Sequence, residues 1–444
     1  MQRTLPGFKT ILIILIIVFT SEFLTALPAV AQDQHSSPWP MAGANSFKNR
    51  RAAVNGPSGA ASLQTWWQYQ APAGAFSGDP VVGEDGTVYV GTTAGAVYAL
   101  DRDGGGVKWS VSLGHPVIGS PAVDAGSGVV YVAYGGTGGG EDFYAICSLD
   151  AGSGNSLWSL RSPPLYGGGD TPITASPAVE SGGIYVPLIN GVWKVTSGGQ
   201  TSWLYGGLDY GDENHCSPAV ADGKVLFVTS LGYGHALSAA DKSLFWKRIV
   251  TGSPLQSGLA EEITPAVSPD GSVMYCCLKN VSTVYAVYAT YGGGKWNFSL
   301  PGFSRPAAVG ADGAVYVSGA NGELFALDPA DGSLRWSVDP GENAAADGSP
   351  AVGGDGTVYL LRGLSLCAID SGSGELRWGY PLAAEGRGVG SPVLAGNGTV
   401  LVRTESFSGE AFCLPWDRML PRRRSLPATR RAAPGKSGST PTWC

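Results

Sequence analysis

Two adjacent cysteines, Cys276 and Cys277, raise the sharpest chemical question in this sequence. Neighbouring cysteines can close a small, strained disulfide ring. They end the run SVMYCC (272–277), which has the composition of a β-strand, and consecutive side chains of an extended strand point to opposite faces. The strand interpretation predicts two small buried thiols, because a bridge between them would distort the peptide and break the strand's hydrogen bonds. Which interpretation holds depends on the fold.

A second group with possible chemistry lies in the segment LDYGDENHC (208–216). Asp212, Glu213 and His215 could bind a cation or support hydrolysis, and the alternative is an ordinary solvated loop. Other signals of catalysis are absent from the sequence. The remaining cysteines are scattered without C-x-x-C spacing, the four histidines form no H-E-x-x-H motif, and there is no G-x-x-x-x-G-K-[ST] loop.

The composition favours an all-β fold. Of 444 residues 67 are Gly, only 14% are charged and 10% are aromatic. Gly, Ser, Val, Tyr and Trp dominate, which is typical of short strands joined by tight turns.

Internal repetition defines the fold more closely. A motif of a small or polar residue, Pro and two apolar residues recurs with its prolines 41 to 56 residues apart. The copies are DPVV (79–82), SPAV (120–123), SPAV (176–179), SPAV (217–220), TPAV (264–267), RPAA (305–308), SPAV (349–352) and SPVL (391–394). Two alternating runs and a Trp follow most copies, so each unit contains four short strands, here named A to D. Four-stranded repeats of this length are typical of β-propeller blades.

The eight motifs predict an eight-bladed propeller of four-stranded antiparallel blades. Small residues suit strand A, which lies nearest the crowded axis, and a Trp can fill the wedge between blades at the rim. The repeat tryptophans are Trp109, Trp158, Trp203, Trp246, Trp296, Trp336 and Trp378. The last unit lacks a D strand, whereas LQTWWQYQ (63–70), with Trp67, resembles one and precedes the first motif. We therefore expect this N-terminal strand to close the last blade and remove the open sheet edges.

The segment from strand C to strand D resembles the pyrroloquinoline-quinone (PQQ) repeat, A-x-D-x3-G-x3-W. One unit carries the full pattern in Ala99, Asp101, Gly105 and Trp109, two others also match fully, and the middle units depart from it. The Asp can cap the turn and the Gly can adopt a positive φ. The chain is thus similar, over about residues 38–416, to the secreted PQQ-repeat, quinoprotein alcohol dehydrogenase-like propellers, a scaffold that hosts many functions.

The resemblance implies two different functions. In the quinone enzymes of this family a disulfide between adjacent cysteines lies over the cofactor, which makes Cys276 and Cys277 weak candidates for cofactor binding. Those enzymes are longer and have inserted loops that supply Ca²⁺ ligands, and no such ligand set can be matched here. The related outer-membrane-assembly lipoproteins imply a propeller that works without a cofactor.

A binding site is expected on the face where the D–A and B–C loops open, because variable loops on a rigid scaffold usually carry function. Besides Asp212, Glu213 and His215, the candidates on this face are Asp170, Arg305 and Arg387. The two arginines precede or begin A strands and could meet an anionic ligand at the channel mouth, the alternative being surface ion pairs.

The chain ends differ from the repeats. Residues 1–31 resemble an export signal, with Arg3 and Lys9 before an apolar run (11–19) too short to span a bilayer, and cleavage expected near Ala31. No Cys follows that site, so no lipid anchor is expected. Residues 32–62 form a lead-in, 63–416 the propeller and 417–444 a disordered basic tail. Without the tail's basic residues the net charge is about −14, which disfavours nucleic-acid binding.

These observations predict a secreted, extracellular or periplasmic, non-catalytic propeller that binds a protein, peptide or glycan through its variable face. No cofactor, metal, nucleic-acid partner or membrane span is expected. The main alternative is an alcohol or sugar dehydrogenase that depends on PQQ and calcium, and a hydrolase or lyase using the loop carboxylates is a third hypothesis. The sequence leaves the oligomeric state open.

Overall fold

The structure is a computed structural model, and the fold described below lies within Met1–Ser408. It describes residues 13–14, 22–27, 39–59, 66–124, 126–138, 141–164, 169–252, 264–278, 281–302, 304–319, 321–339, 348–382 and 386–406. The predicted basic tail (417–444) and the end of the predicted propeller after residue 406 lie outside these residues, as does most of the predicted export signal.

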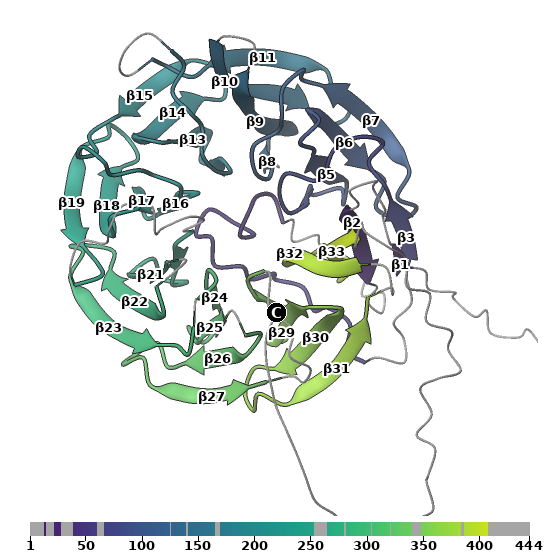
Figure 1. The fold of residues 1–444 in the computed structure, drawn as a ribbon, viewed down its shortest axis with the longest axis vertical. Helices are drawn as coiled ribbons and strands as arrows, with labels where there is room; N and C mark the ends of the chain where they lie inside the picture. The colour runs from purple at the N-terminus through teal and green to yellow at the C-terminus, as the bar shows by residue number, and fades with distance from the viewer. Residues whose placement is uncertain are drawn as a thin grey trace, which may run out of the picture. The chain divides into compact units, whose positions relative to one another are not determined.

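Seven consecutive four-stranded antiparallel sheets form blades I to VII, and each follows the predicted A-to-D order (Figure 1). Blade I consists of β4 (Val81–Val82), β5 (Val88–Gly91), β6 (Ala96–Leu100) and β7 (Val107–Ser112), and blade II of β8 (Ala122–Asp124), β9 (Val129–Gly138), β10 (Glu141–Asp150) and β11 (Ser156–Arg161). Blade III consists of β12 (Ala178–Glu180), β13 (Gly183–Leu188), β14 (Gly191–Thr196) and β15 (Thr201–Tyr205), and blade IV of β16 (Ala219–Ala221), β17 (Lys224–Val228), β18 (Tyr233–Ser238) and β19 (Leu244–Ile249). Blade V consists of β20 (Ala266–Val267), β21 (Val273–Cys277), β22 (Thr283–Tyr288) and β23 (Gly294–Ser299). Blade VI consists of β24 (Ala308–Val309), β25 (Val315–Ser318), β26 (Leu324–Leu327) and β27 (Leu334–Val338), and blade VII of β28 (Ala351–Val352), β29 (Thr357–Arg362), β30 (Ser365–Asp370) and β31 (Leu376–Pro381).

The eighth sheet joins the two ends of the fold and completes the predicted eight-bladed ring. Its strands lie in the order β32 (Gly386–Leu394), β33 (Val400–Ser406), β2 (Glu22–Leu27), β3 (Trp66–Tyr69) and β1 (Ile13–Ile14). The predicted N-terminal strand is therefore present as β3. Sequence analysis did not predict β2, which lies within the expected export signal and pairs with β33 over six residues.

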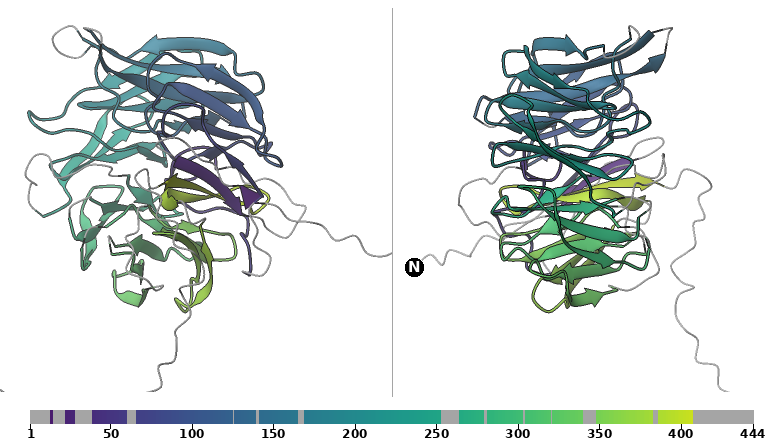
Figure 2. Two further views of the ribbon diagram at one scale, coloured as in Figure 1. Left: turned by 45° about the vertical axis from the view of Figure 1, so that its right-hand side comes forward. Right: turned by 90° about the vertical axis from the view of Figure 1, so that its left-hand side faces the viewer.

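The blades pack face to face because the inner strands place buried apolar residues on both of their sides. Within β24, Ala308 contributes to the core shared with blade VII and Val309 to the core shared with blade V. The outermost strands instead alternate between buried and exposed residues, as β7 does. Figure 2 shows the ring from two other directions, with the sheets arranged around the axis. The core is thus a series of layers between neighbouring sheets, as expected for a propeller.

The repeat motif works as a joint between neighbouring blades. Asp101 accepts hydrogen bonds from the backbone N–H groups of Asp103 and Gly104, at 3.0 and 2.8 Å, and so caps the C–D turn. Gly105 in this turn has a φ of +67°, and a side chain there would collide with the ring of Trp67. The indole of Trp67 in turn donates to the carbonyl of Arg102 at 2.8 Å. Trp67 therefore joins the eighth sheet to blade I.

Residues 39–54, which we call the strap, line the inside of the ring, and sequence analysis did not predict this role. Figure 1 shows the strap in purple, crossing the centre of the ring. Its carbonyl groups accept hydrogen bonds from the N–H groups of inner-strand valines in six blades. These pairs are Val82 with Trp39, Val123 with Pro40, Val220 with Ser46, Val267 with Phe47, Val309 with Asn49 and Val352 with Arg50. The strap thus satisfies backbone groups that would otherwise face the axis.

Candidate functional site

A cavity of about 690 Å³ opens at the end of the ring where the D–A loops enter the A strands. We call this cavity the mouth. Isolated bridges such as Phe76 to Thr92 and Ile173 to Leu188 join D–A loops to the ends of B strands, so the D–A and B–C loops share this face. The residue that precedes the motif Pro lines the mouth in all eight units. These residues are Asp79, Ser120, Ser176, Ser217, Thr264, Arg305, Ser349 and Ser391.

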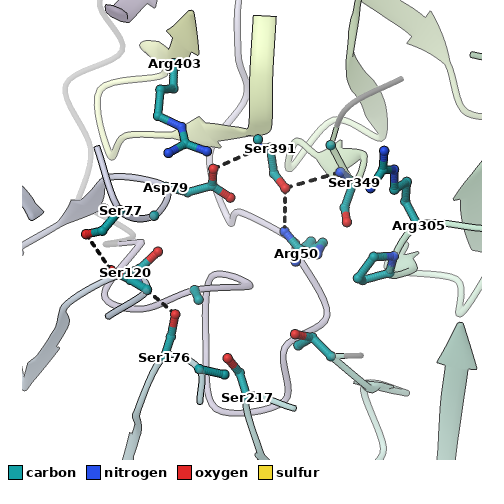
Figure 3. Close-up of a pocket in the computed structure, with 18 of the residues that line it drawn as sticks. Arg50, Ser77, Asp79, Ser120, Ser176, Ser217, Arg305, Ser349, Ser391 and Arg403 are labelled. Atoms are coloured by element: carbon teal, nitrogen blue, oxygen red, sulfur yellow. Dashed lines mark hydrogen bonds between the residues drawn. The ribbon is translucent and has the colours of Figure 1, made fainter. Parts of the chain in front are cut away.

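Hydrogen bonds between blades fix several of these residues in place (Figure 3). The N–H of Ser120 donates to Oγ of Ser176 at 2.8 Å, and the N–H of Ser349 donates to Oγ of Ser391 at 3.2 Å. The N–H of Ser391 donates to Oδ1 of Asp79 at 3.0 Å, which links blade VIII to blade I. Side chains in the mouth are therefore held by the ring itself, so the site is preorganised.

Three arginines reach the mouth from separate parts of the chain. Arg50 belongs to the strap, is only 7% exposed, and donates from Nη1 to Oγ of Ser391 at 3.0 Å. Arg403 extends from β33 and donates to the carbonyl oxygen of Phe76. Arg305 precedes the A strand of blade VI. Asp79 is the single carboxylate among the lining residues that the structure describes.

Lys48 adds a buried amine to the strap. Its side chain is fully buried, and its Nζ has no hydrogen-bond partner among the described atoms. Burial, together with the smaller effect of the Arg50 charge, lowers the pKa of Lys48 from 10.5 to about 7, while Cys216 acts in the opposite direction. A buried amine without a hydrogen-bond partner destabilises the folded protein when it is protonated.

The predicted group in the 208–216 loop, Asp212, Glu213 and His215, does not form one site. Asp212 is buried and accepts hydrogen bonds from the hydroxyl of Thr229 at 2.7 Å and from the N–H of Leu231 at 3.1 Å, so it holds a neighbouring turn. Its burial raises the pKa of this carboxyl group. His215 lies at the mouth and pairs with Glu213, with 2.9 Å between Nε2 and Oε2. Among the described residues no group of His, Cys, Asp and Glu side chains is arranged to hold a metal ion.

The other predicted candidates, Asp170, Arg305 and Arg387, do not come together in one site either. Asp170 lies outside the mouth, where its Oδ2 accepts hydrogen bonds from Nε of Arg161 at 2.9 Å and from the N–H of Tyr144 at 3.1 Å. Arg305 lines the mouth. The backbone of Arg387 pairs with Glu405 in the eighth sheet, but its side chain lies outside the described part of the structure.

Cys276 and Cys277 have the geometry of consecutive strand residues. Both lie in β21, where they pair with Tyr285 and Val284 of β22, and both are free thiols. Cys276 packs in the core that blade V shares with blade IV, whereas Cys277 packs in the core shared with blade VI. Burial raises the pKa of the Cys277 thiol to about 12. These sulfurs point away from each other and lie outside the mouth.

The residues that the structure describes at the mouth do not fit a quinone with calcium. A Ca²⁺ ion requires several oxygen ligands, usually including carboxylates. The mouth supplies only Asp79 among its described residues, and this carboxylate already accepts the N–H of Ser391. The described lining also includes no Trp, Tyr or Phe on which a flat cofactor could stack. The cysteine pair offers no platform above this cavity.

Of the residues named from the sequence, His215 and Arg305 line the mouth, whereas most of its lining was not predicted. Arg50 and Arg403 have no local signal, because Arg50 lies in a segment without strand pattern and Arg403 in the middle of an ordinary B strand. The residues before the motif prolines are visible as a repeat, but apart from Arg305 they were interpreted as a packing requirement. These residues occupy the same motif position in all eight units, and this is the signal that could have identified the mouth.

The family comparison agrees with this architecture. A profile of the family described as outer membrane protein assembly factor BamB (PQQ_2) matches residues 52–205 and 235–424. The outer membrane protein assembly factor BamB of Yersinia pestis is 25% identical over 212 residues, which are 45% of this chain and 51% of that protein. The corresponding protein of Moranella endobia is 28% identical over 148 residues, 31% of this chain and 37% of that protein. The matched region thus spans between about a third and a half of these relatives.

The crystal structure of BamB from Moraxella catarrhalis has a similar fold. It aligns with a TM-score of 0.53 at 16% sequence identity, covering 87% of this chain and 99% of that one. At this identity the likeness concerns the fold alone. Within the described part of this chain, no helix has the length and apolar character needed to cross a bilayer.

Proposed function

Because this chain belongs to the family of the outer membrane protein assembly factor BamB, we propose that it is a non-catalytic propeller that binds another protein. The partner contacts the face on which the mouth opens. The relatives are named as assembly factors, and we extend to this chain the role of a scaffold in protein assembly.

The observation that carries this proposal is the construction of the mouth. All eight blades contribute the same motif position to it, and the strap provides Ala42 and Arg50 from below. Interblade hydrogen bonds such as that from Ser120 to Ser176 hold the lining rigid. A rigid polar surface on variable loops suits recognition, because little side-chain freedom is lost when a partner binds.

Among the ligand classes expected from the sequence, protein or peptide is favoured over glycan. Serine hydroxyls both donate and accept hydrogen bonds and so match peptide N–H and C=O groups. The quinone-dependent dehydrogenase is disfavoured because the described lining of the mouth includes a single carboxylate and because Cys276 and Cys277 point in opposite directions. The hydrolase hypothesis is weakened because Asp212 is engaged by Thr229 and Leu231.

We also propose that the protein acts beyond the cytoplasmic membrane, and that residues 1–31 direct its export. Cleavage near Ala31 would remove β2 (Glu22–Leu27) from the eighth sheet, so the mature ring would need other residues beside β33. N-terminal sequencing of protein recovered outside the cytoplasm tests this proposal. A chain that begins at Gln32 supports it, and a chain that is recovered only with its N-terminus intact contradicts it.

Photo-crosslinking from two positions of blade IV tests the binding face. His215 lies at the mouth, whereas Ala240 is exposed on the C–D turn at the opposite face. A photoreactive amino acid at position 215 should give a discrete protein adduct in cells, and the same residue at position 240 should not. Equal adducts from both positions, or adducts only from position 240, would contradict the proposed face.

Reconstitution tests the dehydrogenase alternative separately. Purified protein is incubated with PQQ and Ca²⁺, desalted, and assayed for quinone absorbance and for dye reduction driven by alcohols or sugars. We expect neither retained quinone nor turnover. Retained quinone together with turnover would overturn the non-catalytic proposal.

A further inference from the structure

Two parts of the expected export signal are strands of the eighth sheet (Figure 1). β1 (Ile13–Ile14) lies within the apolar run of the signal, and β2 (Glu22–Leu27) lies between that run and the expected cleavage position near Ala31. In the sheet, β3 is flanked by β1 on one side and by β2 on the other. These segments of the signal therefore form part of the blade that closes the ring.

β2 is paired at both of its edges. It runs antiparallel to β33 along its whole length, and on its other side Thr25 lies opposite Gln68 of β3. The residues of β33 that pair with it include Val400, Leu401 and Val402, which are at most 1% exposed. A strand between two others leaves a sheet only when the hydrogen bonds at both edges break, so the release of β2 requires the eighth sheet to open.

β2 takes the position and the register of a strand C. Ala26 lies opposite the second residue of β33, as Ala326, the Ala of the repeat pattern, lies opposite the second residue of β25. The sequence LTAL (24–27) also resembles LFAL (324–327), which is strand C of blade VI. The signal thus carries a strand-C pattern, and the ring uses it in the matching register.

The sheet and a signal peptidase compete for the same stretch of chain. Peptidases bind the residues before the cleaved bond in an extended conformation, largely through the backbone, as strand-addition binders do. The small residues that a signal peptidase requires begin at Ala29, two residues after the end of β2. The backbone of β2 is already engaged by β33 and β3, so a peptidase gains access to this stretch only when the sheet opens.

We propose that the ring sequesters its own export signal. The folded precursor holds residues 13–14 and 22–27 in the eighth sheet and resists cleavage near Ala31, so the signal is removed before the ring closes. A chain that folds first keeps its signal and is not exported. This inference rests on the proposed export of the protein, and it adds the order in which cleavage and folding occur.

Cleavage of the full chain by a purified bacterial signal peptidase tests this inference. The chain is presented either folded, or unfolded in urea and diluted rapidly into the assay, and mass spectrometry measures the fraction cleaved. We expect the unfolded chain to be cleaved near Ala31. The folded chain should be cleaved about 10-fold more slowly or less, because cleavage then depends on the small population in which the eighth sheet is open.

Gln68→Pro loosens the eighth sheet without changing the signal. Gln68 is exposed in β3, between β1 and β2, where Pro cannot supply a strand N–H. The folded variant should be cleaved about 5-fold faster than the folded wild type, since the loss of one hydrogen bond shifts an opening equilibrium by a factor of this order. Ser337→Pro is the matched control, because Ser337 is exposed and follows Trp336 as Gln68 follows Trp67. It should be cleaved at the wild-type rate, and tryptophan fluorescence verifies that both variants are folded.

Hydrogen exchange of the β2 amides in the folded full chain is a second measurement that needs no peptidase. These amides should exchange as slowly as those of β33.

Three results would overturn the inference: equal cleavage rates of the folded and unfolded chains, exchange of the β2 amides within seconds, or cleavage of Gln68→Pro no faster than that of Ser337→Pro. Failure of the proposed export gives a different result. If the unfolded chain is not cleaved near Ala31 while the β2 amides exchange slowly, β2 is a permanent strand of the ring and residues 1–31 are not a cleavable signal.

Discussion

Replacement of Lys48 by Met tests whether the strap is packed inside the ring as described. The side chain is fully buried, and its Nζ has no hydrogen-bond partner among the described atoms, so an apolar side chain of similar length loses no bond there. Arg50 and Cys216 are the groups whose charges influence it. If the strap were loose, water would solvate this amine and the replacement would have little effect.

The magnitude follows from the lowered pKa. Lowering it from 10.5 to about 7 corresponds to about 5 kcal/mol, at about 1.4 kcal/mol for each factor of ten in proton affinity. Below pH 7 both states are protonated, and the folded protein bears this full penalty. Between pH 7 and 10.5 the unfolded chain binds the proton and the folded protein does not, so the wild type gains stability as the pH rises. At pH 9 a penalty of about 2 kcal/mol remains.

Urea unfolding followed by tryptophan fluorescence, from pH 6 to pH 9, measures the difference. We expect Lys48→Met to exceed the wild type in free energy of unfolding by several kcal/mol at pH 6, and by about 2 kcal/mol at pH 9. Lys108→Met is the control, because Lys108 is partly exposed and paired with Asp85, and it should change stability by about 0.5 kcal/mol or less. A Met variant that is less stable throughout, or a difference that does not depend on pH, would show that Lys48 is not buried as a destabilising amine.

Three further predictions concern the ring and its core. Trp67→Ala should lower the free energy of unfolding by about 3–5 kcal/mol, because it removes the joint between the eighth sheet and blade I, whereas exposed Gln68→Ala should have almost no effect in the same urea assay. Burial lowers the pKa of His235 to about 3, so between pH 7 and 5 only the unfolded chain gains a proton on this side chain. The wild type should therefore lose about 2 kcal/mol of its free energy of unfolding over this range, and His235→Phe should not show this loss. Equal losses in the two proteins would contradict the prediction. Cys276 and Cys277 should resist a maleimide in the folded protein, and both should react with it in urea without reductant. Mass spectrometry of the peptide measures the labelling, and two residues left unlabelled in urea would indicate a disulfide.

The sequence was sufficient for the architecture because the repeats carry it locally. Small residues beside Pro, alternating apolar runs and the A-x-D-x3-G-x3-W pattern each specify one part of a blade, and Trp67 marked the strand that closes the ring. The alternation of β21 also predicted that Cys276 and Cys277 diverge. These features depend on neighbours in the chain, which a single sequence displays.

The strap, β2 and most of the mouth could not be predicted, because they depend on tertiary contacts. Residues 39–54 have no strand pattern and gain their hydrogen bonds only from the edges of the inner strands. The apolar residues of β2 have the composition of an export signal, so the same pattern supported a different interpretation. Arg50 and Arg403 reach the mouth from segments about 350 residues apart, and nothing in either segment marks that meeting.

Hydrogen exchange of the inner-strand amides tests the central structural claim most directly. The strap forms the floor of the mouth only if its carbonyls accept hydrogen bonds from the valines nearest the axis. The amides concerned are those of Val82, Val123, Val220, Val267, Val309 and Val352. We expect these amides to exchange as slowly as those in the middle strands of the blades, through opening of the whole ring. Exchange within seconds, at the rate of exposed loops, would contradict it, because the inner strands would then face water instead of the strap.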